Sequence, residues 1–206
     1  MCGARRLARY NRAMSAVPTS ERELIRRARA DDEDAFAELV TLNAARVYGA
    51  LRRFGLSEEE ADEVAQEVFL HAWRGLPRFE ERAQFSTWLY RIAYNEAQRR
   101  RSRRALPRVE PDPDGEDPIA AVPESPNAGP EAQTLSHEFQ QLLDRALDQL
   151  PAEWRDAVVL RDIEGLSTED AAGIAGVRQA AFKSRLHRGR MRLRALLEPY
   201  LKLEEG

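Results

Sequence analysis

Seven basic side chains gather near the carboxyl end of the chain, where their spacing favours binding to a polyanion. They are Arg178, Lys183, Arg185, Arg188, Arg190, Arg192 and Arg194. No aspartate or glutamate occurs between Asp170 and Glu198. A solvated helix face usually carries both signs, because opposite charges four residues apart attract and like charges repel. A helix of one sign therefore indicates a nucleic acid, and a merely soluble basic helix is the less favoured interpretation.

The residues just before this basic segment predict the joint of a helix-turn-helix. Ser167 is suited to cap a short helix, with Asp170 three residues further on as in a capping box. Gly176 stands where the turn needs a residue that tolerates positive φ. Val177 would fill the angle between the two helices. We therefore interpret residues 166–197 as a DNA-reading helix-turn-helix.

A second group of candidate residues belongs to a helix predicted from Ser86 or Thr87 to about Arg104. Its inner stripe consists of Trp88, Leu89, Ile92 and Ala93. Asn95 follows Trp88 by seven residues and should continue this apolar face. An amide there is more often a satisfied structural group, and the alternative is a group that reads a base edge. Aromatic rings and cations surround it, a combination that suits single-stranded nucleic acid: Tyr90, Arg91, Tyr94, Arg99, Arg100, Arg101, Arg103 and Arg104.

The helix predicted between Ser57 and Gly75 carries acids on its outer face. Ser57 and Glu60 form a capping box. The residues expected to face inward are Ala61, Val64, Val68, Leu70, His71, Ala72 and Trp73. Acids in the first turn suit the helix dipole. Glu63, Gln66 and Glu67 lie further in, and they indicate either a basic protein partner or simple solvation.

Composition divides the 206 residues into two helical domains. Residues 105–132 hold seven of the 11 prolines and seven acids against one arginine, which predicts an extended, mobile linker. We expect a disordered extension at 1–18, a first domain at 19–104 and a second at 133–206. Helices are predicted on either side of Asp31 to Asp34, from Gln133 to Leu150, and from Pro151 to Gly165. No segment alternates like a strand, so the predicted fold is all-α.

The sequence offers no constellation typical of an enzyme or a metal site. The three histidines, His71, His137 and His187, are far apart, and no nucleophile motif or phosphate-binding glycine loop occurs. We therefore expect neither catalysis nor a cofactor nor a metal. The single cysteine, Cys2, fits a reducing cytoplasm. No apolar segment reaches the ~18 residues of a membrane-spanning helix, so no membrane insertion is expected.

Taken together, the motifs resemble those of the extracytoplasmic-function group of bacterial RNA polymerase sigma factors. The resemblance covers about residues 21–104 and 133–201. It depends on five segments in order: AFAELV, EADEVAQEVFLHAWRGLPRF, FSTWLYRIAYNEA, LPAEWRDAVVLRDIEGLS and KSRLHRGRMRLR. The chain departs from many relatives at Ala180-Ala181-Phe182, where they carry a Gly-Thr pair before KSR.

The resemblance implies three binding surfaces and three partners. The surface for core RNA polymerase, which engages its β′ clamp helices, would include Asp62, Glu63, Gln66, Glu67 and Phe69. The surface that captures a flipped base of the promoter −10 element, with help from the loop 79–85, would include Phe79, Arg91, Tyr94, Asn95 and Arg99. The −35 surface would include Arg161, Arg178, Lys183, Ser184, Arg185, His187 and Arg188. The resemblance also implies contact with the polymerase β flap and control by an anti-sigma factor.

Two other classes of function compete with this interpretation. A conventional helix-turn-helix regulator would act on an operator without joining the polymerase, but it needs neither the acidic helix nor the aromatic-basic one. A helical protein that binds RNA or single strands would use the second domain as an interaction module. Activity with core polymerase separates these possibilities.

Overall fold

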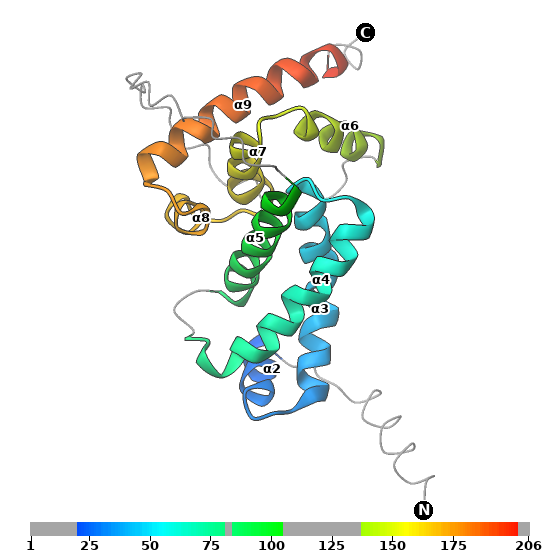
Figure 1. Ribbon diagram of the computed structural model, residues 1–206, viewed down its shortest axis with the longest axis vertical. Coiled ribbons are helices and arrows are strands. Elements are labelled where there is room, and N and C mark those ends of the chain that lie inside the picture. Colours follow the sequence, from blue (N-terminus) through cyan, green and yellow to red (C-terminus); the bar gives the residue numbers. More distant parts are fainter. Residues whose placement is uncertain (1–19, 81–83, 105–136, 202–206) are drawn as a thin grey trace, which may run out of the picture.

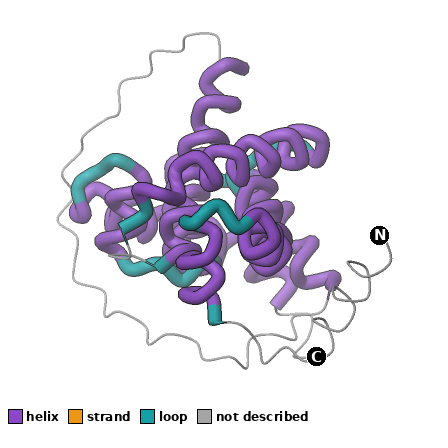
Figure 2. The backbone as a smooth tube through the Cα atoms, turned by 90° about the horizontal axis from the view of Figure 1, so that it is seen from below, coloured by secondary structure: helices purple, strands orange, loops and turns teal. Residues whose placement is uncertain are grey.

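The computed structural model describes residues 20–80, 84–104 and 137–201. Every regular element in these ranges is helical, which confirms the predicted all-α fold (Figure 2). The first domain contains α2 (Glu21–Ala28), α3 (Glu33–Arg53), α4 (Glu58–Gly75), a 3-10 turn (Leu76–Arg78) and α5 (Phe85–Arg104). The second contains α6 (His137–Asp148), α7 (Ala152–Val158), a π-helical turn (Val159–Ile163), α8 (Thr168–Ala175) and α9 (Gln179–Leu201).

Local capping signals set the helix ends of the first domain. Asp32 accepts a hydrogen bond of 3.0 Å from the backbone N of Ala35, so α3 begins within the predicted break, at Glu33. Ser57 and Glu60 form the predicted reciprocal capping box of α4. Gly55, at φ +86°, lets α3 turn back into α4. Helix α5 then packs on both α3 and α4 and closes an apolar core (Figure 1).

The start of α5 and the burial of Leu70 differ from the sequence-based expectation. Helix α5 begins at Phe85, ahead of Ser86 and Thr87, and the backbone carbonyl of Gln84 accepts its first hydrogen bond from Trp88. Leu70, predicted to face inward, is 48% exposed. It lies on the side of α4 away from α3 and α5, because Val68 and Ala72 already fill the inner positions.

The second domain is built around the predicted helix-turn-helix. Ser167 caps α8 through the backbone N of Asp170, and Gly176 ends it in the left-handed conformation at φ +69°. Phe182 belongs to the segment Ala180-Ala181-Phe182, where the chain differs from many relatives. It is fully buried and anchors the start of α9. Gly189 permits close packing, since a Cβ there would lie 2.8 Å from a Val158 methyl carbon. The predicted start of the first helix of this domain at Gln133 lies outside the described residues, as do segments 1–18 and 105–132.

The two domains lie against each other. Helix α5 of the first domain contacts α8, and α3 contacts α6 (Figure 1). Buried apolar residues of both domains form one continuous cluster.

Candidate nucleic-acid and protein interfaces

The outer face of α4 presents the residues expected to bind polymerase. Asp62, Glu63, Gln66 and Glu67 are all exposed, and Phe69 is half-buried behind them. Their spacing of three and four residues places them on one side of the helix, because that spacing spans about one turn. Leu70, predicted to face the core, adds an exposed apolar group to this face. Among the described residues this acidic face is exposed, and Glu63 also pairs with Arg100 of α5.

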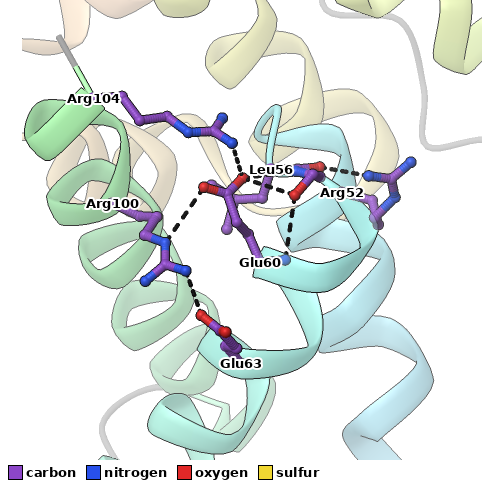
Figure 3. Close-up of polar contacts among 7 residues, drawn as sticks. Arg52, Leu56, Glu60, Glu63, Arg100 and Arg104 are labelled. Atoms are coloured by element: carbon purple, nitrogen blue, oxygen red, sulfur yellow. Dashed lines mark hydrogen bonds and ion pairs between the residues drawn. The ribbon is translucent and has the colours of Figure 1, made fainter.

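Behind this face, Glu60 joins α4 to the end of α5 (Figure 3). Its carboxylate accepts a 2.9 Å hydrogen bond from the backbone N of Ser57 and forms a 2.6 Å ion pair with Arg104. Arg100 lies between Glu60, at 3.4 Å, and Glu63. Burial raises the pKa of Glu60, but the Ser57 hydrogen bonds and the guanidinium groups of Arg104 and Arg100 hold that pKa below its usual range. Glu60 therefore acts as a structural anion.

The arginines at the end of α5 consequently differ in their availability to nucleic acid. Arg100 and Arg104 are tied to α4, and Arg101 is tied to the second domain through Asp156. Arg99 is exposed, although Glu96 accepts a 2.8 Å hydrogen bond from it. Glu96 also lies 3.0 Å from Nδ1 of His71 on α4. The cationic segment 99–104 is thus largely engaged in contacts within the protein.

Asn95 was expected to continue the apolar face of α5, and that expectation is wrong, because its side chain is exposed. Trp88, seven residues earlier, is only half-buried at the edge of the core, and no described element covers the helix face beyond it. Arg91, Asn95 and Arg99 form an exposed row along α5, four residues apart. The structure therefore removes the argument that Asn95 is a buried structural amide.

Two other residues predicted for −10 binding lie elsewhere. Phe79 is 4% exposed and packs against Phe85 and Trp88, with ring centroids at 5.7 Å and 4.9 Å. Tyr94 is 7% exposed and lies close to Asp156 of the second domain, and its hydroxyl accepts a hydrogen bond from Gln98 of the same helix. Burial and the nearby Asp156 raise the pKa of Tyr94 to about 12. Residues 81–83 of the loop 79–85 lie outside the described ranges.

In the second domain, the residues predicted for −35 binding lie on and beside α9. Lys183 and His187 are exposed on one side of the helix, and Arg178 is exposed just before it. The half-buried members of this set are Arg161, Ser184, Arg185 and Arg188. The structure therefore brings the α9 residues together at one surface, as expected for a recognition helix.

Three acids of α7 and the π-helical turn hold arginines in place, and none of the three was predicted as a functional residue from the sequence. Glu153 lies 3.2 Å from Arg185, and Asp162 accepts two hydrogen bonds, of 2.9 Å and 2.6 Å, from Arg190. Asp156 bonds Arg101 of the other domain. The segment LPAEWRDAVVLRDIEG alternates acids and arginines, which indicates ion pairs, but the alternation does not predict which arginine pairs with each acid.

Across residues 20–80, 84–104 and 137–201, no group of three or more histidine, cysteine or acidic side chains could hold a metal ion. None of the helices described in these ranges is long and apolar enough to cross a bilayer.

Comparisons with known proteins match both domains. The family model of sigma-70 region 2 matches residues 39–106, and that of sigma-70 region 4 matches residues 140–193. RNA polymerase sigma-H factor of Pseudomonas aeruginosa is 34% identical over 187 residues, which cover 88% of this chain and 96% of that protein. The ECF RNA polymerase sigma-E factor of Escherichia coli K12 is 32% identical over 188 residues, covering 89% and 97%.

Solved structures show the same architecture. CnrH, solved with the cytosolic domain of CnrY, aligns with a TM-score of 0.59 and 26% identity, covering 87% of this chain and 97% of that one. The sigma factor RpoE of Bartonella quintana, solved with the anti-sigma factor NepR, aligns with a TM-score of 0.58 and 30% identity, covering 79% and 96%. The chain therefore belongs to the extracytoplasmic-function sigma factors of the sigma-70 family.

Proposed function

We propose that this sigma factor binds core RNA polymerase through the outer face of α4 and directs it to promoters by reading the −10 element with α5 and the −35 element with α9. The observation that carries the proposal is the exposure of both an acidic face on α4 and a basic face on α9 in a chain that matches both sigma regions. Complementary charge would guide the acidic face to basic polymerase helices. The factor would act in the cytoplasm, at the nucleoid when active.

For polymerase, the proposed contacts are Asp62, Glu63, Gln66 and Glu67, with Phe69 and the exposed Leu70 adding apolar area. The clamp helices of β′ are the proposed partner of this face. The β flap is the proposed partner of the second domain.

For the −10 element, the proposed contacts are the exposed row of Arg91, Asn95 and Arg99. An asparagine amide can pair with an unstacked base, while the flanking guanidinium groups neutralise phosphates. Phe79 would support the loop from within its aromatic cluster. Tyr94 would join this surface only when the second domain leaves it.

For the −35 element, the proposed contacts are the residues of α9 and its approach. Lys183, Arg185 and Arg188 would bind guanine edges or phosphates, and His187 and Ser184 would contact the same groove. Arg178 and Arg161 would bind the backbone on either side. We also propose an anti-sigma partner, since two similar sigma factors were solved with such a protein or with a cytosolic domain.

Run-off transcription tests the proposal. Purified chain added to core polymerase should give specific transcripts from promoters that respond to its overexpression. A variant with Asp62→Lys and Glu67→Lys should lose core binding, whereas Glu21→Lys, an exposed acid on α2, should not. A chain inactive with core polymerase that instead binds a palindromic operator tightly would be a conventional regulator.

Asn95→Ala tests the −10 surface separately. Because the side chain is exposed, the variant should keep its melting temperature and its affinity for core polymerase while losing about tenfold or more in open-complex formation, the equivalent of one good base contact. A loss of folding stability without a transcription defect at permissive temperature would instead make Asn95 a structural residue.

A further inference from the structure

A buried carboxylate lies at the junction of α4 and α5 and takes no part in the proposed binding surfaces. Glu96 on α5 is 7% exposed. Its Oε1 lies 2.8 Å from Nη1 of Arg99, on the same helix, and 3.0 Å from Nδ1 of His71, on α4. Burying a carboxylate without partners is costly. Glu96 is therefore stable at this junction because it holds an arginine and a histidine at one oxygen atom.

The two groups that Glu96 holds remain open to solvent. The side chain of His71 is 41% exposed and that of Arg99 63%. An ionised carboxylate can only accept hydrogen bonds, so the contact favours the histidine tautomer that carries its proton on Nδ1. This contact orients the ring and leaves Nε2 as the nitrogen that can meet an external ligand. Glu96 thus places an imidazole of α4 beside a guanidinium of α5.

The charge along α4 changes sign just before this junction. All acidic residues of the helix lie within 58–67, and every titratable residue within 71–78 is basic. Arg74, one turn beyond His71, is exposed. On α5, Arg99 belongs to the exposed row proposed to bind the −10 element. The acidic polymerase face therefore ends before His71, and the exposed groups around the junction favour an anionic ligand.

Charged groups lie near the His71 ring on two helices. From α5, the carboxylate of Glu96 favours the charged imidazolium, and the guanidinium of Arg99 opposes it. On α4 itself, Glu67 lies one turn before His71 and Arg74 one turn after it, so their effects oppose each other. The negative charge of a bound phosphate would add to the effect of Glu96.

Helix α3 packs on the other side of α4. Trp73 contacts Phe36 of α3 there, with ring centroids 4.8 Å apart. Residues two positions apart on a helix point about 200° from each other, so α3 lies away from the His71 ring. With a neutral ring, Glu96 cancels the charge of Arg99, whereas a charged ring gives the three groups a net positive charge. Phosphate binding and protonation of His71 should accordingly favour each other.

We propose that His71 and Arg99 form a phosphate clamp that binds the backbone of single-stranded DNA, and that Glu96 is the positioning residue that orients both groups. The clamp extends the proposed −10 surface from α5 onto α4, so its role in promoter reading rests on the proposed function. Binding of a phosphate adds a proton from solvent to Nε2 of His71, which then donates to a phosphate oxygen. Arg99 contacts Glu96 through Nη1, and its guanidinium has further N–H donors for the same phosphate.

Nitrogen NMR of the full chain labelled at histidine tests the positioning step without DNA. The ring signal that disappears in His71→Gln should show the Nδ1–H tautomer at alkaline pH, because Glu96 accepts from that nitrogen. Glu96→Ala should convert this ring to the mixture of tautomers found in a solvated imidazole. An Nε2–H ring in the parent, or an unchanged ring in Glu96→Ala, would overturn the role of Glu96.

Binding of a mixed-sequence single-stranded DNA oligonucleotide at constant salt tests the clamp. On going from pH 8 to pH 6, the affinity of the parent should rise by about threefold or more beyond any rise in His71→Gln, since imidazole groups titrate in this range. His71→Lys carries a permanent charge, so it should lose this pH dependence and bind more tightly than His71→Gln at pH 8. Equal pH dependence in the parent and His71→Gln overturns the clamp.

Variants at two arginines separate the clamp from a general effect of charge. Arg99→Gln should weaken binding and reduce the pH-dependent gain, because the proton and the guanidinium meet at one phosphate. Arg22→Gln, which removes an exposed arginine of α2, should keep the full pH dependence. A purely structural His71 would lower the melting temperatures of His71→Gln and His71→Lys without separating their affinities at pH 8, and that result would also overturn the clamp.

Three outcomes distinguish the clamp from the proposed function and from a polymerase contact. If Asn95→Ala impairs open-complex formation while the His71 variants bind the oligonucleotide like the parent, the clamp is wrong and the −10 surface stands. If the His71 variants behave as expected but Asn95→Ala has no defect, the phosphate clamp stands and the assignment of α5 to the −10 element fails. If His71→Gln loses affinity for core polymerase only, the junction belongs to the polymerase surface and the clamp is overturned.

Discussion

Helices α5 and α9 both end a domain with a cluster of arginines, yet they use those charges differently. In α5, Arg100 and Arg104 are bound by Glu60, and Arg101 by Asp156. In α9, Lys183 and His187 face solvent. The difference comes from the neighbouring elements, because α4 and α7 place Glu60 and Asp156 next to the arginines of α5. Cationic clusters of similar composition can therefore serve as interhelical contacts or as a reading surface.

The largest expected effect is the loss of the support beneath α9. Phe182→Ala removes a fully buried ring and should lower the free energy of unfolding of the second domain by about 3–5 kcal/mol. Helix α9 would then lose the base that orients its basic face, whereas α5 would remain supported by its ion pairs. Thermal unfolding followed by circular dichroism should show an early transition for the second domain only.

Phe182→Leu is the matched control, since it keeps most of the apolar volume and should cost clearly less. Equal losses for alanine and leucine would mean that the aromatic shape, and not the buried volume, supports α9. A loss below about 1 kcal/mol for alanine would show that the site repacks.

A smaller effect is expected when an acid beneath α5 is neutralised. Glu60→Gln keeps the shape and one acceptor for Ser57, but it removes the charge that holds Arg100 and Arg104. We expect the free energy of unfolding to fall by about 1–2 kcal/mol at neutral pH. The freed arginines should also become available to phosphates, so the variant should bind single-stranded DNA more tightly than the parent.

The pH dependence of this change follows from the lowered pKa of Glu60. Folding lowers that pKa from its ordinary value of 4.5, so the carboxylate stabilises the folded state above about pH 4.5. The contribution is lost as pH falls through the folded pKa. Chemical denaturation from neutral to acid pH should therefore show the parent and Glu60→Gln converging below pH 4.5. Glu59→Gln, an exposed acid of the same turn, should change little at any pH.

The same contrast explains which features the sequence could predict. The helix break at Asp31 to Asp34, the capping box at Ser57 and the left-handed turn at Gly176 depend on residues close to one another in the sequence, and all are confirmed. Local chemistry decides such features, so they can be inferred without knowing the tertiary structure.

Features that depend on distant neighbours were missed. The exposure of Asn95 depends on which element covers that part of α5, and periodicity alone does not say. Arg101 and Asp156 are separated by 55 residues, and nothing in the spacing of either cluster pairs them. The polymerase, −10 and −35 residues themselves remain predictions, although the exposure of most of them agrees with a binding role.

The smallest predicted effect concerns an arginine of α9 that forms an ion pair within the second domain. It tests whether such an arginine still contributes to DNA binding. Arg188 has no ion pair among the described residues, whereas Arg190 is bound by Asp162 through both carboxylate oxygens. Arg188→Ala should therefore reduce the salt dependence of duplex binding by about one unit, and Arg190→Ala by clearly less. Titrations of mixed-sequence duplex DNA at several salt concentrations measure both slopes. If the two variants show the same salt dependence of duplex binding, Arg190 must leave Asp162 and bind a phosphate. An ion pair with a neighbouring acid would then not distinguish a structural arginine from a DNA-binding one.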